Sequence, residues 1–97
     1  MIRSFATRGT EDVFNRRDSR QARRTCPQPV WDMARRKLDM LNAAVSLVSL
    51  RLPPGNMLEA LKGERRGQHS LRINDRFRLC FVWTADGPAE VEIVDYH

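Results

Sequence analysis

Residues 58–96 contain three turn motifs that divide this part of the chain into four short runs with strand character. The motifs are rich in glycine, asparagine, aspartate and proline, and they occupy residues 63–67, 74–75 and 86–88. Between them, apolar and polar side chains alternate, and β-branched and aromatic residues recur, as is typical of half-buried strands. Short connections of this kind join neighbouring antiparallel strands. The pattern therefore predicts an antiparallel meander of four strands.

The first half of the chain predicts one short strand and two helices. Residues 2–6 alternate apolar and polar side chains, which indicates the strand. Thr10 is expected to cap a short helix, because Glu11 and Asp12 follow it where the helix dipole favours carboxylates. Pro29 is expected to begin a longer helix that covers the apolar side of the sheet. Its apolar side chains recur at helical spacing, and they are Val30, Met33, Ala34, Leu38, Met40, Leu41, Val45 and Val48.

Residues 15–28 interrupt this pattern with five arginines, one aspartate and no apolar periodicity. Two interpretations stay open, a basic arm that binds nucleic acid and a solvated, mobile linker, and a charge run of this kind favours the linker. Prolines 53 and 54 end the helical part of the chain. The order of elements predicts a single α+β domain over residues 1–97, in which two N-terminal helices pack on a mostly antiparallel sheet.

The charge of the chain indicates an anionic partner. The net charge is +5, and of 17 basic residues only Lys37 and Lys62 are lysines. Arginine grips phosphates and carboxylates at two points and stacks on bases, so RNA, DNA or an acidic protein would fit. A genome rich in G and C would also favour arginine. With no long apolar run and no signal peptide, we expect a cytoplasmic protein without membrane contact.

The two cysteines predict no metal site and no disulfide. Cys80 lies in an expected strand, where a small buried apolar residue explains it. Cys26 lies in the basic segment, and the sequence leaves open whether it is buried or reactive.

Many positions match a known family at matched spacing along nearly the whole chain. They are Ile2-Arg3-Ser4-Phe5, Pro54-Gly55-Asn56, Leu58, Leu61-Lys62-Gly63, Gly67, Ser70, Arg72-Ile73-Asn74, Arg78, Phe81 and Val94-Asp95-Tyr96-His97. On these residues the chain resembles the HigB-type toxins of the RelE/ParE superfamily, and within them the GraT-like subgroup. The resemblance implies a compact RelE-like fold and ribosome-dependent cleavage of mRNA without metal or cofactor.

The same resemblance implies partners. They are the ribosome, mRNA and a HigA-type helix-turn-helix antitoxin, through which alone the toxin would reach operator DNA. The implied antitoxin leaves the active site largely open, so we expect its contact on the helical side and on Arg16 to Arg24.

The resemblance assigns a phosphate clamp to three basic residues. Arg72 and Arg78 match the arginines of the family's sheet, and Lys62 matches the basic residue before the first turn. Donors fixed in place around a developing negative charge usually make the greatest contribution to the rate of such a reaction. Charge alone adds three RNA-binding candidates on the meander, which are Arg65, Arg66 and Arg76.

Proton transfer would fall to the end of the chain. His97 matches the family's terminal histidine and would act as general acid or base. Tyr96 would stack on a base or donate a proton, and Asp95 would orient His97 or accept from an arginine. Glu59 stands where the family carries a second histidine, so it would act as a general base or pair with an arginine and dampen cleavage. His69 is expected to point toward the helices.

Two other functions remain open at this stage. One is a non-catalytic relative that acts by docking, as ParE-type toxins do on DNA gyrase, and the other is a small ribosome-binding protein. The presence of Tyr96 and His97 beside the arginines favours the nuclease.

Overall fold

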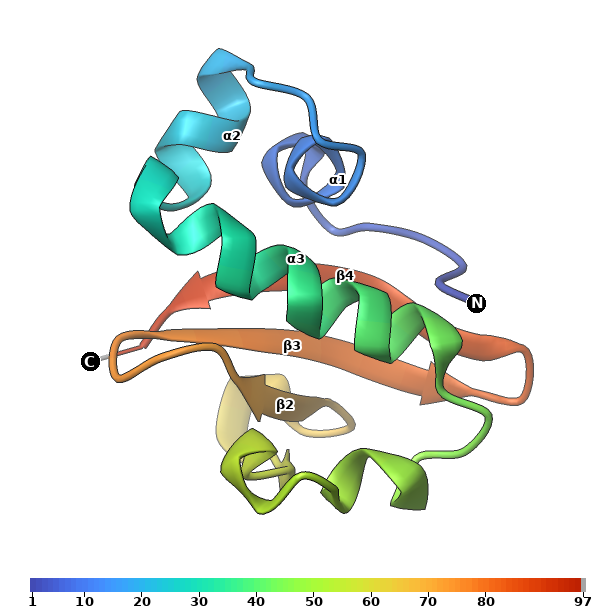
Figure 1. Ribbon diagram of the computed structural model, residues 1–97. Coiled ribbons are helices and arrows are strands. Elements are labelled where there is room, and N and C mark those ends of the chain that lie inside the picture. Colours follow the sequence, from blue (N-terminus) through green and yellow to red (C-terminus); the bar gives the residue numbers. More distant parts are fainter. Residues whose placement is uncertain (97) are drawn as a thin grey trace.

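A four-stranded antiparallel sheet forms the C-terminal half of the protein in a computed structural model that describes residues 1–96 (Figure 1). The strands are β1 (Glu59–Ala60), β2 (His69–Arg72), β3 (Phe77–Thr84) and β4 (Gly87–Asp95). Their order in the sheet is β1-β2-β3-β4, and each pair of neighbours is antiparallel. The predicted meander is therefore confirmed, with its connections at the three turn motifs.

Three α-helices precede the sheet rather than the two expected from the sequence. They are α1 (Arg8–Phe14), α2 (Arg20–Thr25) and α3 (Gln28–Ala43), and three short 3-10 helices follow at η1 (Val48–Arg51), η2 (Pro54–Asn56) and η3 (Gly63–Arg65). Helix α3 lies across one face of β3 and β4, while α1 and α2 pack against each other beyond it (Figure 1). Helices on one side of an antiparallel sheet make an α+β domain, so the predicted fold class is confirmed.

Helix α2 shows that residues 15–28 are not a linker. Ser19 caps the helix, because its hydroxyl oxygen accepts from the Ala22 amide at 3.0 Å and its O–H donates to Asp12 at 2.6 Å. Ala22 and Cys26 are buried, and the Cys26 carbonyl accepts from the Trp31 indole N–H at 2.9 Å. Only these two small residues face the core from α2, so the segment has no apolar periodicity from which the helix could be predicted.

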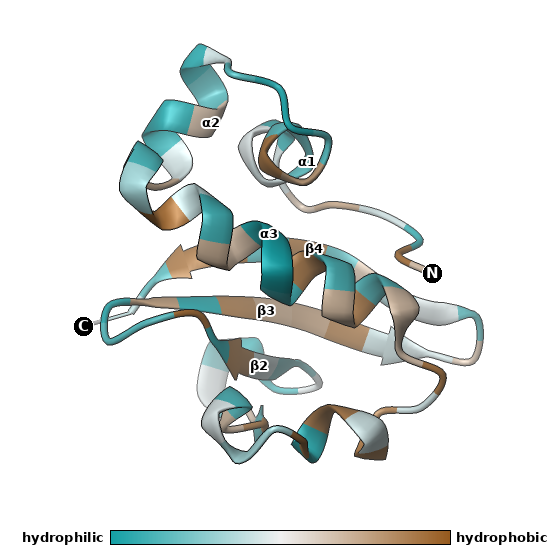
Figure 2. Cartoon of the chain, viewed as in Figure 1, coloured by the Kyte–Doolittle hydropathy of each residue, from teal (hydrophilic) through white to brown (hydrophobic). Residues whose placement is uncertain are grey.

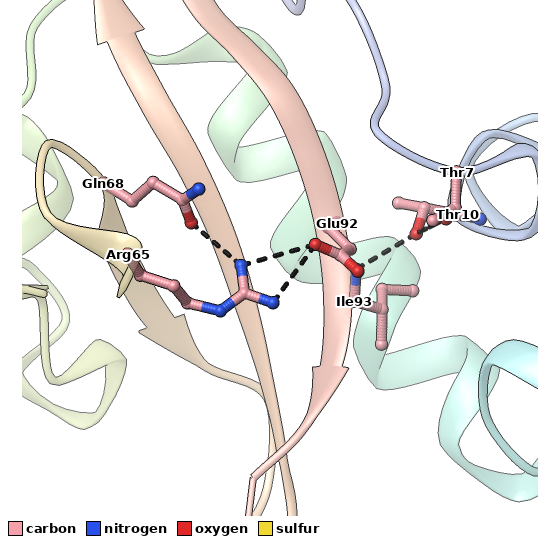
Figure 3. A network of polar contacts seen from close by, with 6 residues as sticks. All are labelled: Thr7, Thr10, Arg65, Gln68, Glu92 and Ile93. Carbon is pink, nitrogen blue, oxygen red and sulfur yellow. Dashed lines mark hydrogen bonds and ion pairs between the residues drawn. The ribbon is translucent and has the colours of Figure 1, made fainter. Parts of the chain in front are cut away.

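The cap of α1 and the N-terminal strand also differ from the prediction. Thr7 is the cap, since its hydroxyl accepts from the Thr10 amide at 3.2 Å. Thr10 is buried instead, and its hydroxyl accepts the Ile93 amide of β4 at 3.0 Å (Figure 3). Residues 2–6 run beside β4, but within residues 1–96 they make a single parallel bridge, between Phe5 and Val91, and no full strand.

The core lies between α3 and the covered face of the sheet. Trp31, Ala34, Leu38 and Leu41 are the buried residues of α3. The sheet contributes six buried side chains that alternate along β2, β3 and β4, and they are Leu71, Phe77, Leu79, Phe81, Val91 and Ile93. Each large apolar side chain buried here contributes about 1.5–3 kcal/mol. Helix α3 ends before Val45 and Val48, which the apolar stripe had included and which are exposed.

Gly9 gives a stability prediction, because it is the point of closest approach between α1 and α2. A Cβ at Gly9 would lie 1.8 Å from the Thr25 hydroxyl oxygen and 2.5 Å from the Gln21 carbonyl oxygen. Alanine would gain about 1 kcal/mol in helix propensity. Overpacking costs about 1–3 kcal/mol, and more where backbone must move. The Gln21 carbonyl belongs to the backbone, so the upper end of this range applies, and we expect Gly9→Ala to lower the free energy of unfolding by about 2 kcal/mol in urea titrations.

Gly55→Ala is the matched control for this prediction, because a Cβ there meets no atom within 4 Å. We expect it to leave the urea midpoint nearly unchanged. A Gly9→Ala protein as stable as the parent would show that α2 can move away from α1 at little cost.

Candidate functional site

The face of the sheet turned away from α3 carries two of the basic residues that the sequence singled out, Arg72 and Arg78. Leu79 points into the core, so its neighbour Arg78 points to the opposite side. The strand register places Arg72 beside Arg78, and Ser70 between Glu59 and Cys80. We call this surface the arginine face, and its residues are Glu59, Ser70, Arg72, Arg78, Glu92 and Tyr96.

Arg78 is held at the centre of the arginine face by protein groups on several sides. Its Nε–H donates to the Ser70 hydroxyl at 2.8 Å, and Nη2 donates to the Met57 carbonyl at 2.6 Å. Nη1 lies 3.5 Å from the Glu59 carboxylate, and the guanidinium carbon lies 5.9 Å from the Tyr96 ring centre. The side chain is 11% exposed. Arg78 is thus fixed before any ligand arrives, with part of its N–H groups left for one.

Arg72 lies next to Arg78 and is more open. It forms an ion pair with Asp75, which is almost fully exposed. Lys37 of α3 is a basic neighbour that the sequence reasoning missed, and its ammonium donates to buried Asn56 at 2.6 Å. Burial, and then the positive charge of Arg72, lower the pKa of Lys37. That Lys37 is one of two lysines among fifteen arginines was the available signal.

The loop between β1 and β2 brings three more predicted basic residues to the rim of the arginine face. Figure 3 shows Arg65 reaching from this loop to β4, where Nη1 and Nη2 lie 3.3 Å from the Glu92 carboxylate. Arg65 also donates to the Gln68 side-chain oxygen at 3.0 Å. Arg65 therefore anchors the loop and is partly neutralised by Glu92. Lys62 and Arg66 are exposed, so they are the residues of this loop that a phosphate can reach.

Arg76 and Asp95 pair with each other away from Arg78. Arg76 Nε lies 3.0 and 3.1 Å from the two carboxylate oxygens of Asp95, and Nη2 lies 2.7 Å from one of them. These hydrogen bonds raise the pKa of Arg76. Asp95 is opposite Phe77 in the register, so the strand places it on the core side of the sheet. Of the two expected roles for Asp95, the structure displays pairing with an arginine, and it does not bring Arg76 to the arginine face.

Tyr96 extends the arginine face at the end of β4. Its amide donates to the Arg76 carbonyl at 2.6 Å, while its ring, 44% exposed, lies by Arg78. The backbone bond and the ring contact thus fix the last described residue against both neighbouring arginines. His97 lies outside the described residues, so its expected role stays a prediction.

His69 and Cys26 lie away from this chemistry, whereas Cys80 is buried beneath the arginine face, between Ser70 and Glu92 in the strand register. His69 packs on Phe81 with ring centres 6.3 Å apart, on the core side, as the strand alternation predicted. Cys80 and Cys26 are both buried, and burial raises the pKa of the Cys26 thiol to about 11. A thiol held in its protonated form is a poor nucleophile. Within residues 1–96 no three histidine, cysteine, aspartate or glutamate side chains form a group that could hold a metal ion, and no helix there is long and apolar enough to cross a membrane.

Comparison with known proteins identifies the family to which the chain belongs. A family described as the RelE-like toxin of type II toxin-antitoxin system HigB matches residues 3–97, and the chain belongs to this HigB-like toxin family. Toxin HigB-1 of Vibrio cholerae serotype O1 is 40% identical over 74 residues, which are 76% of this chain and 77% of that protein. An uncharacterized protein of Haemophilus influenzae is 36% identical over 57 residues, which are 59% and 56% of the two chains. The resemblance seen in the sequence is confirmed.

Proposed function

We propose that this toxin is a ribosome-dependent, metal-independent endonuclease that cleaves mRNA, inhibits translation and is neutralised by a HigA-type helix-turn-helix antitoxin. Its working partners are the ribosome and mRNA in the cytoplasm, and it reaches operator DNA only through the antitoxin. The observation that carries the proposal is Arg78, which Ser70 and Met57 hold at the centre of the arginine face, beside the ring of Tyr96. Membership of a toxin family supports it.

Metal-free cleavage uses the 2′-hydroxyl of the RNA as nucleophile on the adjacent phosphate. Charge then accumulates on a pentacoordinate phosphorane, and fixed positive donors stabilise it without reorganising. Arg78 fits this role because its hydrogen bonds to Ser70 and Met57 already set its orientation. Arg72 and the exposed Lys62 would hold the neighbouring phosphates. A rim of basic side chains also gives affinity for RNA that falls as salt rises.

Proton transfer requires groups beside the clamp. Tyr96, whose ring lies by Arg78, would stack on a base or donate from its hydroxyl, and we assign the general acid or base role to His97. Because so few titratable groups are available, the ribosome would supply the alignment of the mRNA, a contribution that reaches many kcal/mol in well-oriented reactions.

Mapping mRNA 5′ ends in a translating extract, with and without the protein, tests this proposal. New ends confined to translated messages are expected. Unchanged messages with arrested translation would instead support a ribosome-binding protein, and unchanged messages with inhibited gyrase would support a ParE-like docking toxin.

Free protein is expected to cleave purified RNA at a rate at least about 100-fold below its rate on ribosome-bound mRNA, because alignment is lost. The measurement compares the same transcript alone and in a programmed ribosome complex, under single-turnover conditions. Equal rates on both substrates would contradict ribosome dependence.

Glu59 gives a further prediction, since its carboxylate competes with phosphate for Arg78. We expect Glu59→Gln to raise the cleavage rate by up to about fivefold, because an exposed ion pair is worth about 0.2–1 kcal/mol. The side chain of Glu59 is 53% exposed, so the fold of the variant protein should be unaffected. Slower cleavage at unchanged ribosome binding would instead make Glu59 a general base.

A further inference from the structure

The segment that joins α3 to β1 exposes more large apolar side chains than any other stretch of residues 1–96. They are Val45, Val48, Leu52 and Met57, with exposed fractions of 92%, 65%, 71% and 52%. The segment follows α3 and passes on the β2 side of the sheet, and Figure 2 shows several hydrophobic residues along it. Exposed apolar side chains gathered in one segment mark an interaction surface.

A pocket of about 200 Å³ opens within this surface. Its lining residues are Leu47, Val48, Arg51, Leu58, Ala60 and His69. Sites that enclose a small molecule usually measure roughly 300–1,000 Å³. This smaller pocket fits one apolar side chain, and the exposed side chain of Val48, which lines it, offers a further apolar contact to a larger partner.

The charges of this surface favour an acidic partner. Arg51 is the single charged residue among residues 45–58, and it is both exposed and part of the pocket lining. The whole chain carries a net charge of +5, which opposes docking of a second copy or of a basic segment. Complementary charge around an apolar contact sets both orientation and specificity.

We propose that residues 45–58 form a docking site for a peptide segment of a protein partner, in which one apolar side chain enters the pocket and flanking carboxylates face Arg51. The pocket lies on the opposite side of β2 from Arg72, because its lining residue His69 packs with core residue Phe81, while the Met57 carbonyl at the end of the segment accepts from Arg78. The proposal is independent of RNA cleavage, and its test needs no ribosome.

The test is a titration of the full chain, followed by NMR, with three capped pentapeptides. The probe is Glu-Asp-Leu-Asp-Glu, and the controls are Glu-Asp-Ser-Asp-Glu and Lys-Lys-Leu-Lys-Lys. We expect the probe alone to shift the amides of Leu47 and Ala60 and the ring of His69 in a saturable manner. The imidazole is a sensitive reporter, because its Nδ1 is buried without a hydrogen-bond partner among residues 1–96.

Two variants of exposed residues sharpen the outcome. Val48→Asp should weaken binding of the probe at least tenfold, and Arg51→Glu should reverse the preference so that the lysine peptide binds better. Three results would overturn the proposal. They are equal binding of all three peptides, shifts that depend on protein concentration without peptide and so report self-association, and a response to anionic lipid vesicles but not to the probe.

Discussion

Alanine in place of Arg78 is expected to lower the cleavage of translated mRNA by about 100- to 1,000-fold, the usual effect of removing one fixed donor from a developing negative charge. Arg78 is the best-held cation of the arginine face, through Ser70 and Met57. The rate is to be measured on programmed ribosomes at saturating protein, so that weaker binding to the ribosome does not lower the measured rate.

The same contacts mean that Arg78→Ala also affects stability. The Arg78 side chain is 11% exposed and donates two internal hydrogen bonds. We therefore expect its removal to lower the free energy of unfolding by about 1–3 kcal/mol. The sequence alone suggested no such cost. Arg72→Ala is the cleaner probe of the clamp, because Arg72 is 36% exposed and pairs with exposed Asp75. It should slow cleavage without lowering stability.

Arg36→Ala provides a matched loss of one positive charge, from an exposed position on α3. Cleavage by this variant should stay near that of the parent. A fully active Arg78→Ala protein, once shown to be folded, would exclude Arg78 from the clamp. An Arg36→Ala protein as impaired as Arg72→Ala would show that net charge, rather than the arginine face, sets the rate.

The sheet was predictable from the sequence because its information is local. Each turn motif fixes a connection, and alternation along the strands assigns Leu79 to the core and Arg78 to the open face. That inference also placed His69 correctly. The candidate site followed in outline, since Arg72 and Arg78 had to share a face.

Other features depended on contacts between distant residues, which no local pattern records. Thr10 reads as a cap, yet it is buried because the Ile93 amide, 83 positions away, needs an acceptor. Arg65 stays a predicted RNA contact, and its ion pair with Glu92 of β4 across the sheet is a contact that its local sequence does not indicate. The sequence pattern indicates that Lys37 is an exposed charge on a helix, yet its ammonium donates to Asn56 and feels the charge of Arg72.

The end of the chain gives the second large prediction. A protein truncated after Asp95 is expected to lose cleavage by about 100- to 10,000-fold, the range of general acid–base catalysis. The stability cost should stay near 1–2 kcal/mol, that of an ordinary substitution, because Tyr96 is exposed and loses one backbone hydrogen bond to Arg76. Val91 and Ile93 remain in the core. Single-turnover rates and urea unfolding measure the two effects separately.

Substitutions at Tyr96 show how much of the truncation effect is due to Tyr96 and how much to His97. The Tyr96 ring lies by Arg78, so stacking rather than the hydroxyl is the interaction that the structure displays. Tyr96→Phe should therefore keep cleavage within about tenfold of the parent, while Tyr96→Ala loses more, since stacking on a base is worth about 1–3 kcal/mol. A Phe variant as inactive as the truncated chain would make the hydroxyl the proton donor. A truncated chain with full activity would remove both residues from the mechanism and leave the clamp of Arg72, Arg78 and Lys62 as its whole chemistry.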